Sequence, residues 1–242
     1  MEIFDDLVAE QDHLEALLAG LDAAAWRSPS AAPGWSVADV VLHLAQTEEA
    51  VVASAAGSDI ATAFPRAGSL DEAMDLRVQA ERAEPATVFE RWRTARRAAV
   101  AALVAADPQR PITWAAAPLK PRTLATTRLA EHWAHGLDVA EPLGLAFPDT
   151  DRLRHVAWLG HGSLPYAFAL AGEAPHPVRC ELAAPDGSTW TYGPADADST
   201  ITGPAGDFCR VGAQRLTADR SGLVAGGPHG ATALRLLRNY AA

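Results

Sequence analysis

The spacing of apolar residues changes near Pro148, and this change limits the chain to a fold with two unlike parts. Before Pro148, apolar residues recur at the period of a helix that is buried on one face. After it, short runs rich in β-branched and aromatic residues are typical of strands. The sequence therefore predicts the α+β class, with a four-helix bundle in residues 1–148 and a small α+β domain in residues 149–242.

Local signals place the predicted elements. Pro33-Gly34 marks a turn, Ser36 is expected to cap the helix that follows, and Asp39 occupies the capping-box position. Trp35, directly before the cap, is expected to pack on this helix as a hydrophobic staple. Asp186-Gly187 predicts a β-hairpin. The Gly-rich residues 225–230 are interpreted as a turn. Further helices are expected at residues 4–18, 86–106, 123–139, 150–171 and 231–240, strands at 178–183, 189–192 and 199–202, and loops at 57–68 and 108–121.

Charge and composition exclude several classes of function. The net charge is −10, and no basic stripe or polybasic patch is present to bind nucleic acid or anionic lipid. No apolar run is long enough to span a bilayer, and the first residues do not resemble a signal peptide. The two cysteines are far apart, which favours a reducing, cytoplasmic setting. The expected partner is a small anionic substrate, since a few local arginines can override the average charge. The sequence carries no signal for an oligomeric state.

A candidate metal site comes from residues on two predicted helices. Glu131 and His135 are four positions apart, so they project from one face of their helix. His132 points about 100° away from Glu131. His43 lies in the middle of the second helix, and a bundle can bring these two helices together. Two histidines and one carboxylate, with an open fourth position, are the usual ligands of catalytic zinc.

Two simpler interpretations remain open from spacing alone. An E-x-x-x-H pair on a helix is often a surface pair, and a single histidine such as His43 is often a hydrogen-bonded core or surface residue. If the metal site exists, Asp138 and Asp39 are the carboxylates expected to orient its imidazoles.

Two segments resemble a known family. They are PGWSVADVVLHLAQTEE at residues 33–49 and EHWAHGLDVA at residues 131–140. Both are similar to the DinB-like metal-binding bundles, and more closely to the mycothiol-dependent maleylpyruvate isomerase branch. The resemblance implies that His43, Glu131 and His135 hold a divalent metal, with zinc expected. Glu131 favours this branch because other DinB-like members carry H-x-x-x-H at this place. Residues 199–227 are similar to the branch's sterol-carrier-like C-terminal domain.

The resemblance also implies a reaction. In this branch the metal takes a thiol, mycothiol, as thiolate, and the thiolate adds to the double bond of a carboxylated substrate. The bond rotates and the thiolate leaves. An arginine of the C-terminal domain is expected to hold the carboxylates. Arg215 aligns best with it, although Ala213 and Gln214 precede it where the family has glycine; Arg210 is the second candidate. The expected function is therefore a metal- and thiol-dependent isomerase acting on an unsaturated acid.

Other functions fit the same motifs. A thiol S-transferase or a biosynthetic lyase would use the same metal and thiol. A module that binds a metal or a ligand without catalysis is the alternative from another class. An open coordination position favours an enzyme, whereas a closed shell of four protein ligands favours a structural site.

Overall fold

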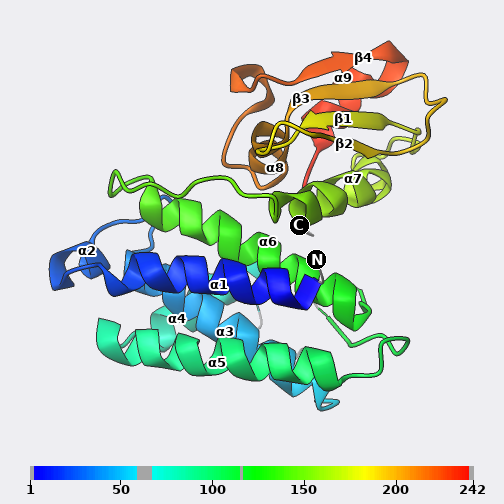
Figure 1. Ribbon diagram of the computed structural model, residues 1–242. Helices are drawn as coiled ribbons and strands as arrows, with labels where there is room; N and C mark the ends of the chain where they lie inside the picture. Colours follow the sequence, from blue (N-terminus) through cyan, green and yellow to red (C-terminus); the bar gives the residue numbers. More distant parts are fainter. Residues whose placement is uncertain (1–2, 59–66, 115–116, 240–242) are drawn as a thin grey trace. The chain divides into compact units, whose positions relative to one another are not determined.

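The protein is described by a computed structural model over residues 3–58, 67–114 and 117–239 (Figure 1). It divides into two compact units, of which the first ends at Phe147 and the second begins at Pro148. The first consists of helices and the second contains a four-stranded sheet, so the predicted α+β class is confirmed. That residues 1–148 and 149–242 are independent domains stays a prediction. Among the described residues, no helix combines the length and the apolar character that a membrane span requires.

Within the described residues, the first unit contains four long helices, and two shorter ones come between them in the sequence. The long helices are α1 (Ile3–Ala19), α3 (Val37–Ala55), α5 (Pro85–Ala105) and α6 (Pro121–Ala140). The short ones, which the sequence analysis did not anticipate, are α2 (Ala23–Arg27) and α4 (Leu70–Ala80). Helix α3 packs on α5, while α1 packs on α6 (Figure 1). Most of the loop predicted at residues 57–68 lies outside the described residues.

The start of α3 is fixed by the predicted capping box, which is confirmed. Ser36 accepts a hydrogen bond from the backbone N–H of Asp39, and the Asp39 carboxylate accepts one from the backbone N–H of Ser36. Arg82 donates two further bonds to this carboxylate, of 2.8 and 3.1 Å. Helices α5 and α6 both have proline at the first position, where no intrahelical N–H partner is lost.

The largest share of the bundle's apolar core comes from α3. Its members are aliphatic side chains and tryptophans with almost no exposed surface. Burial of this kind stabilises the fold by about 25 cal/mol per Å² of apolar surface removed from water. Helix α3 is therefore the central packing element of this unit. The buried members include Leu14, Leu18, Val37, Val40, Val41, Leu44, Val88 and Trp92.

The second unit is a small sheet with three α-helices. Helix α7 (Leu153–Leu170) precedes β1 (Arg179–Ala183), β2 (Thr189–Tyr192) and β3 (Thr200–Pro204). Then follow α8 (Ala205–Gly212), a short 3₁₀ helix (Ala218–Arg220), β4 (Val224–Gly226) and α9 (Gly227–Leu236). The strand order is β2-β1-β3-β4; β1 pairs antiparallel with β2 and parallel with β3, and β3 pairs antiparallel with β4.

The predicted hairpin is present between β1 and β2. Gly187 has a φ of 83°, a conformation that glycine adopts without steric cost, and the Asp186 carboxylate accepts the Ser188 N–H at 2.8 Å. One helix of this unit was not expected, and one other expectation was wrong. Helix α8 was not expected, and the segment interpreted as a turn at residues 225–230 contains the end of β4 and the start of α9. Pro228 fits there because it stands in the first turn of α9.

Candidate metal centre

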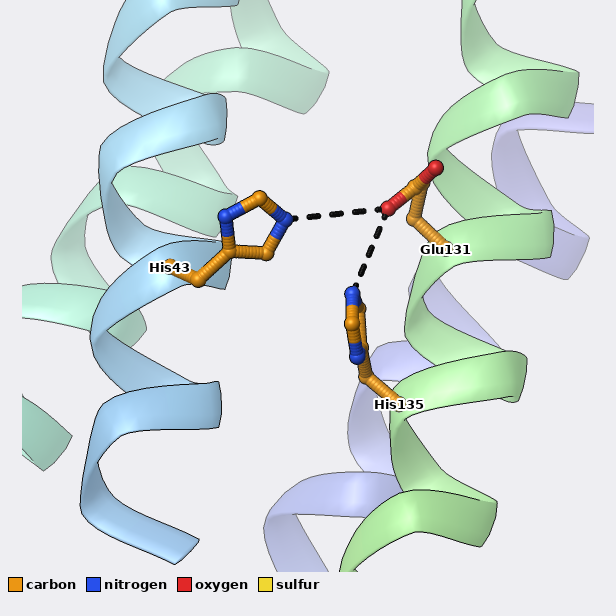
Figure 2. A group of neighbouring side chains, drawn as sticks. All are labelled: His43, Glu131 and His135. Carbon is orange, nitrogen blue, oxygen red and sulfur yellow. Dashed lines mark ion pairs between the residues drawn. The ribbon is translucent and has the colours of Figure 1, made fainter. Parts of the chain in front are cut away.

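The three residues predicted as metal ligands lie together between α3 and α6. One ligand atom from each of His43, Glu131 and His135 lies within 4.8 Å of the other two. The Glu131 Oε2 atom is 3.8 Å from His43 Nε2 and 3.5 Å from His135 Nε2. Figure 2 shows the carboxylate and both imidazoles turned toward one another, His43 from α3 and the other two from α6. Helix periodicity places Glu131 and His135 on one face, and bundle packing brings His43 opposite them.

The orientation of His135 is fixed by Asp138. The Nδ1–H of His135 donates to Asp138 Oδ2 at 2.9 Å, so the lone pair of the neutral ring is on Nε2, the nitrogen nearer Glu131. This is the arrangement by which a second carboxylate holds a metal-binding imidazole in the ligating tautomer. Asp39, the other carboxylate expected to orient an imidazole, is instead engaged in the α3 capping box and with Arg82.

Burial and charge set the protonation of the group. Burial raises the pKa of Glu131, but the neighbouring His135 and His43 and the Arg128 charge hold it well below its ordinary value overall. Burial lowers the pKa of His43 to about 4, despite the opposing effect of Glu131. Burial also opposes protonation of His135, but Asp138 and Glu131 raise the pKa of this ring overall. The ionised carboxylate and the neutral His43 are the forms that bind a cation.

A buried polar network adjoins the three residues. Arg128 donates to Glu48 Oε1 at 2.8 Å and to Thr47 Oγ1 at 2.7 Å, and all three side chains are buried. The Thr47 hydroxyl in turn donates to the backbone carbonyl of His43 at 3.0 Å. Arg128 therefore links α6 to α3 within a helical turn of Glu131. Neither Arg128 nor Glu48 was anticipated, although Arg128 shares the helix face of Glu131 and His135.

His132 belongs to this network rather than to the metal group. Its Nε2 accepts the indole N–H of Trp92 at 3.1 Å, and its Nδ1–H donates to the Arg128 carbonyl at 2.8 Å. Burial, aided by the Arg128 charge, lowers the pKa of His132 to about 3. His132 is thus a neutral packing residue that faces away from Glu131, as the helix geometry predicts.

The donor set fits a divalent metal ion such as zinc. Two imidazoles and one carboxylate are the ligands that zinc accepts, and His135 already presents the correct nitrogen. His43 Nδ1 is buried and accepts no hydrogen bond from the described residues. The neutral ring can therefore carry its proton on Nδ1 and its lone pair on Nε2. The side chain of Glu131 is 30% exposed, against 10% and 11% for His43 and His135. Glu131 is therefore the member of the group that is most open to solvent.

The two arginines expected to bind substrate belong to the second unit. Arg210 lies in the last turn of α8 and holds both oxygens of Asp149, at 2.7 and 2.9 Å. Arg215 follows α8, is half-buried, and donates to the carbonyl of Ala213 at 2.6 Å. Neither lies in a strand.

Similarity to known proteins agrees with this fold. Two uncharacterized proteins, from two strains of Mycobacterium tuberculosis, are 39% identical to the chain over 218 residues, which is 87% of this chain and 84% of each relative. The crystal structure of the mycothiol-dependent maleylpyruvate isomerase and that of a mutant of this enzyme both match with a TM-score of 0.63. The identities are 15% for the enzyme and 14% for the mutant, and each match covers 93% of this chain and 95% of the solved chain. At this identity the likeness establishes the fold alone.

Membership of a family follows from the sequence itself. The family described as the mycothiol maleylpyruvate isomerase N-terminal domain matches residues 7–140, a span that includes His43, Glu131 and His135. The resemblance inferred from the two motifs is thereby confirmed. The chain belongs to the mycothiol maleylpyruvate isomerase N-terminal domain family.

Proposed function

We propose that this protein is a metal-dependent enzyme that uses a low-molecular-weight thiol, of the mycothiol type, to isomerise an unsaturated, carboxylated small molecule. The observation that carries the proposal is the convergence of His43, Glu131 and His135 from two helices. The reaction class is that of the mycothiol-dependent maleylpyruvate isomerase, whose solved structures have a similar fold.

In this proposal His43, Glu131 and His135 hold one divalent cation, with zinc as the first candidate. A bound divalent cation lowers the pKa of a thiol that coordinates it, and so makes a thiolate available near neutral pH. Asp138 keeps His135 in the ligating tautomer. Arg128 and Thr47 fix the backbone of His43 relative to α6. Because Glu131 is the most exposed of the three ligands, the thiol and the substrate approach from its side.

The isomerisation needs no net redox change. The thiolate adds to the electron-poor double bond of the substrate, and the bond becomes single and rotates. Expulsion of the thiolate restores the double bond in the other geometry and returns the thiol unchanged. Dividing the rotation into addition and elimination gives two easier steps in place of one difficult one.

Binding of the substrate carboxylates is assigned to Arg215. A guanidinium matches a carboxylate with two parallel hydrogen bonds. Arg210, whose guanidinium is paired with Asp149, is the second candidate because Arg215 aligns better with the arginine of the family.

A catalytic role is preferred to a structural one because the group has three members within the described part of the chain. Three protein ligands leave a coordination position for a reactant, whereas structural zinc sites use four. We place the enzyme in the cytoplasm, since its two cysteines are free and buried, as is typical of proteins in a reducing compartment.

The test begins with elemental analysis of the purified protein, which should give one divalent metal ion per chain. A cobalt-substituted sample titrated with mycothiol should then develop sulfur-to-cobalt charge-transfer absorption. Thiol concentration followed during turnover separates the reactions, because an isomerase returns the thiol and an S-transferase consumes it. Absence of a bound metal, or a cobalt spectrum that mycothiol leaves unchanged, would refute the proposed function.

A further inference from the structure

The indole of Trp35 lies against both imidazoles of the metal group. Its ring centroid is 5.1 Å from that of His43, with the planes tilted by 45°. It is 6.5 Å from that of His135, with the planes within 27° of parallel. The imidazoles themselves are 5.0 Å apart. Trp35 packs against the apolar core, as the sequence predicts, and it also lies beside two of the three ligands.

Both ends of Trp35 are held in place. On the backbone side, its carbonyl accepts bonds from the N–H and the hydroxyl of Ser30, at 2.9 and 2.8 Å. On the side-chain side, its indole N–H donates to Asp75 Oδ1 at 2.9 Å. Asp75 lies on α4, so this bond ties the short helix to the metal group. The bonds from Ser30 hold the backbone of Trp35, and the indole cannot swing away from the imidazoles without breaking its bond to Asp75.

From these contacts we propose that Trp35 is a positioning residue of the metal centre, which covers one side of the imidazole pair and leaves the Glu131 side open to ligands. The proposal deepens the proposed function and rests on it for the metal. The large apolar surface of an indole excludes water from the side it covers. It also restricts rotation of the two rings, as other groups packed around metal ligands do. Asp75 acts one step further out, by holding the indole.

The first test uses metal-free protein and diethyl pyrocarbonate, which modifies accessible neutral imidazoles. The rate at each histidine is mapped by mass spectrometry in the wild type and in Trp35→Ala, Trp35→Phe and Asp75→Ala. In Trp35→Ala, His43 and His135 should react several-fold faster, while the buried His132 should react at the wild-type rate. Asp75→Ala keeps the indole but frees it, so a smaller increase is expected at the same two residues.

Trp35→Phe retains a ring and should remain closer to the wild type than Trp35→Ala. If His43 and His135 react at wild-type rates in both Trp35→Ala and Asp75→Ala, the proposal is wrong. It is also wrong if His132 accelerates with them, because general loosening of the bundle would then explain the change. Should Trp35→Ala not fold, the Asp75→Ala variant decides between these outcomes.

The second test measures zinc affinity by competition with a chelator. Removal of a group that supports metal ligands typically weakens binding by about 10–100-fold, and Trp35→Ala should fall near the lower end of this range. Trp26→Phe is the matched control, because Trp26 belongs to the apolar core of the same bundle and contacts Phe89 rather than the histidines. Equal zinc affinities in the wild type and Trp35→Ala would refute the positioning role. A wild type that binds no zinc would refute the proposed function instead, while the metal-free labelling would still decide whether Trp35 covers the imidazoles.

Discussion

The two units of the chain bury different kinds of side chain. Among the described residues of the second unit, the buried polar side chains are Ser199 and Asn239, together with the thiols of Cys180 and Cys209. The first unit buries histidines, carboxylates and arginines, and many of them lie on α3 and α6. Those on these two helices include Asp39, His43, Glu48, Arg128, His132, His135 and Asp138.

The difference indicates which unit is built around a polar site. Removing charges from water costs several kcal/mol per ion, and apolar side chains of similar volume often serve stability as well or better. Within the first unit, α3 contacts α6 through buried polar side chains, His43, Thr47 and Glu48. Its ion pair with α5, Glu49 with Arg91, is more exposed. Keeping ionisable groups buried at the α3–α6 contact is costly for stability, which indicates that they serve chemistry or the support of chemistry.

The largest expected effect is at Glu131. Glu131→Ala removes the only carboxylate of the three-residue group, so the purified variant should lose its stoichiometric metal. Elemental analysis and a chelator competition measure this. Glu141→Ala, at the exposed end of the same helix, is the matched control and should keep the metal. Full metal content and unchanged affinity in Glu131→Ala would exclude Glu131 as a ligand.

The second expected effect is on stability and concerns the buried Arg128–Glu48 pair. Arg128→Met leaves the Glu48 carboxylate buried without its partner, so the free energy of unfolding should fall by about 3–5 kcal/mol. The double variant Arg128→Met/Glu48→Leu should recover most of this loss, because both charges are then removed. Urea unfolding measures all three proteins.

An exposed ion pair provides the comparison for that experiment. Arg27 and Glu84 are 3.0 Å apart, but both side chains are mostly in solvent. Their disruption by Arg27→Met should cost only about 0–1 kcal/mol. If Arg128→Met costs no more than Arg27→Met, the buried network does not contribute in the way that its geometry indicates.

The third prediction concerns Asp138, which contacts the metal group through its hydrogen bond with His135. Asp138→Asn keeps the size of the side chain but removes the charge that fixes the imidazole tautomer, so zinc affinity should fall by about 10–100-fold. Asp149→Asn in the second unit is the control, since Asp149 is likewise paired with one side chain, Arg210. Zinc affinity that is equal in the wild type and Asp138→Asn would remove Asp138 from the site.

The sequence predicted the part of the site that depends on one helix. Four-residue spacing was enough to place Glu131 and His135 on one face. The approach of His43 depends on how α3 packs on α6; the sequence allowed it in a bundle, and the family resemblance supported it. Arg128 and Glu48 were missed because isolated arginines and glutamates are normally assigned to the surface. Each can be buried because the other is its hydrogen-bond partner, and the two residues are eighty positions apart in the sequence.

Long elements of the fold were predicted better than short ones for a physical reason. Periodicity needs several turns to stand out, and α1, α3, α5 and α6 each provide them. Helix α8 spans only eight residues and contains two glycines, so its amphipathic spacing covers too few turns to be recognised as a helix. It forms because Phe208, Cys209 and Val211 are buried within the second unit, which is a tertiary effect.

The smallest expected effect tests the apolar side of the comparison. Cys180 is fully buried on β1, and burial raises the pKa of its thiol to about 12, so the thiol stays protonated at neutral pH and acts as a small apolar side chain. Cys180→Ala should therefore lower the free energy of unfolding by about 1 kcal/mol, the usual cost of a single substitution, and leave metal content and thiol-dependent turnover unchanged. Urea unfolding, elemental analysis and a turnover assay measure the three quantities. If Cys180→Ala kept its stability but lost turnover, the second unit would contribute a reactive group of its own, and the assignment of the chemistry to α3 and α6 would have to be extended to the sheet.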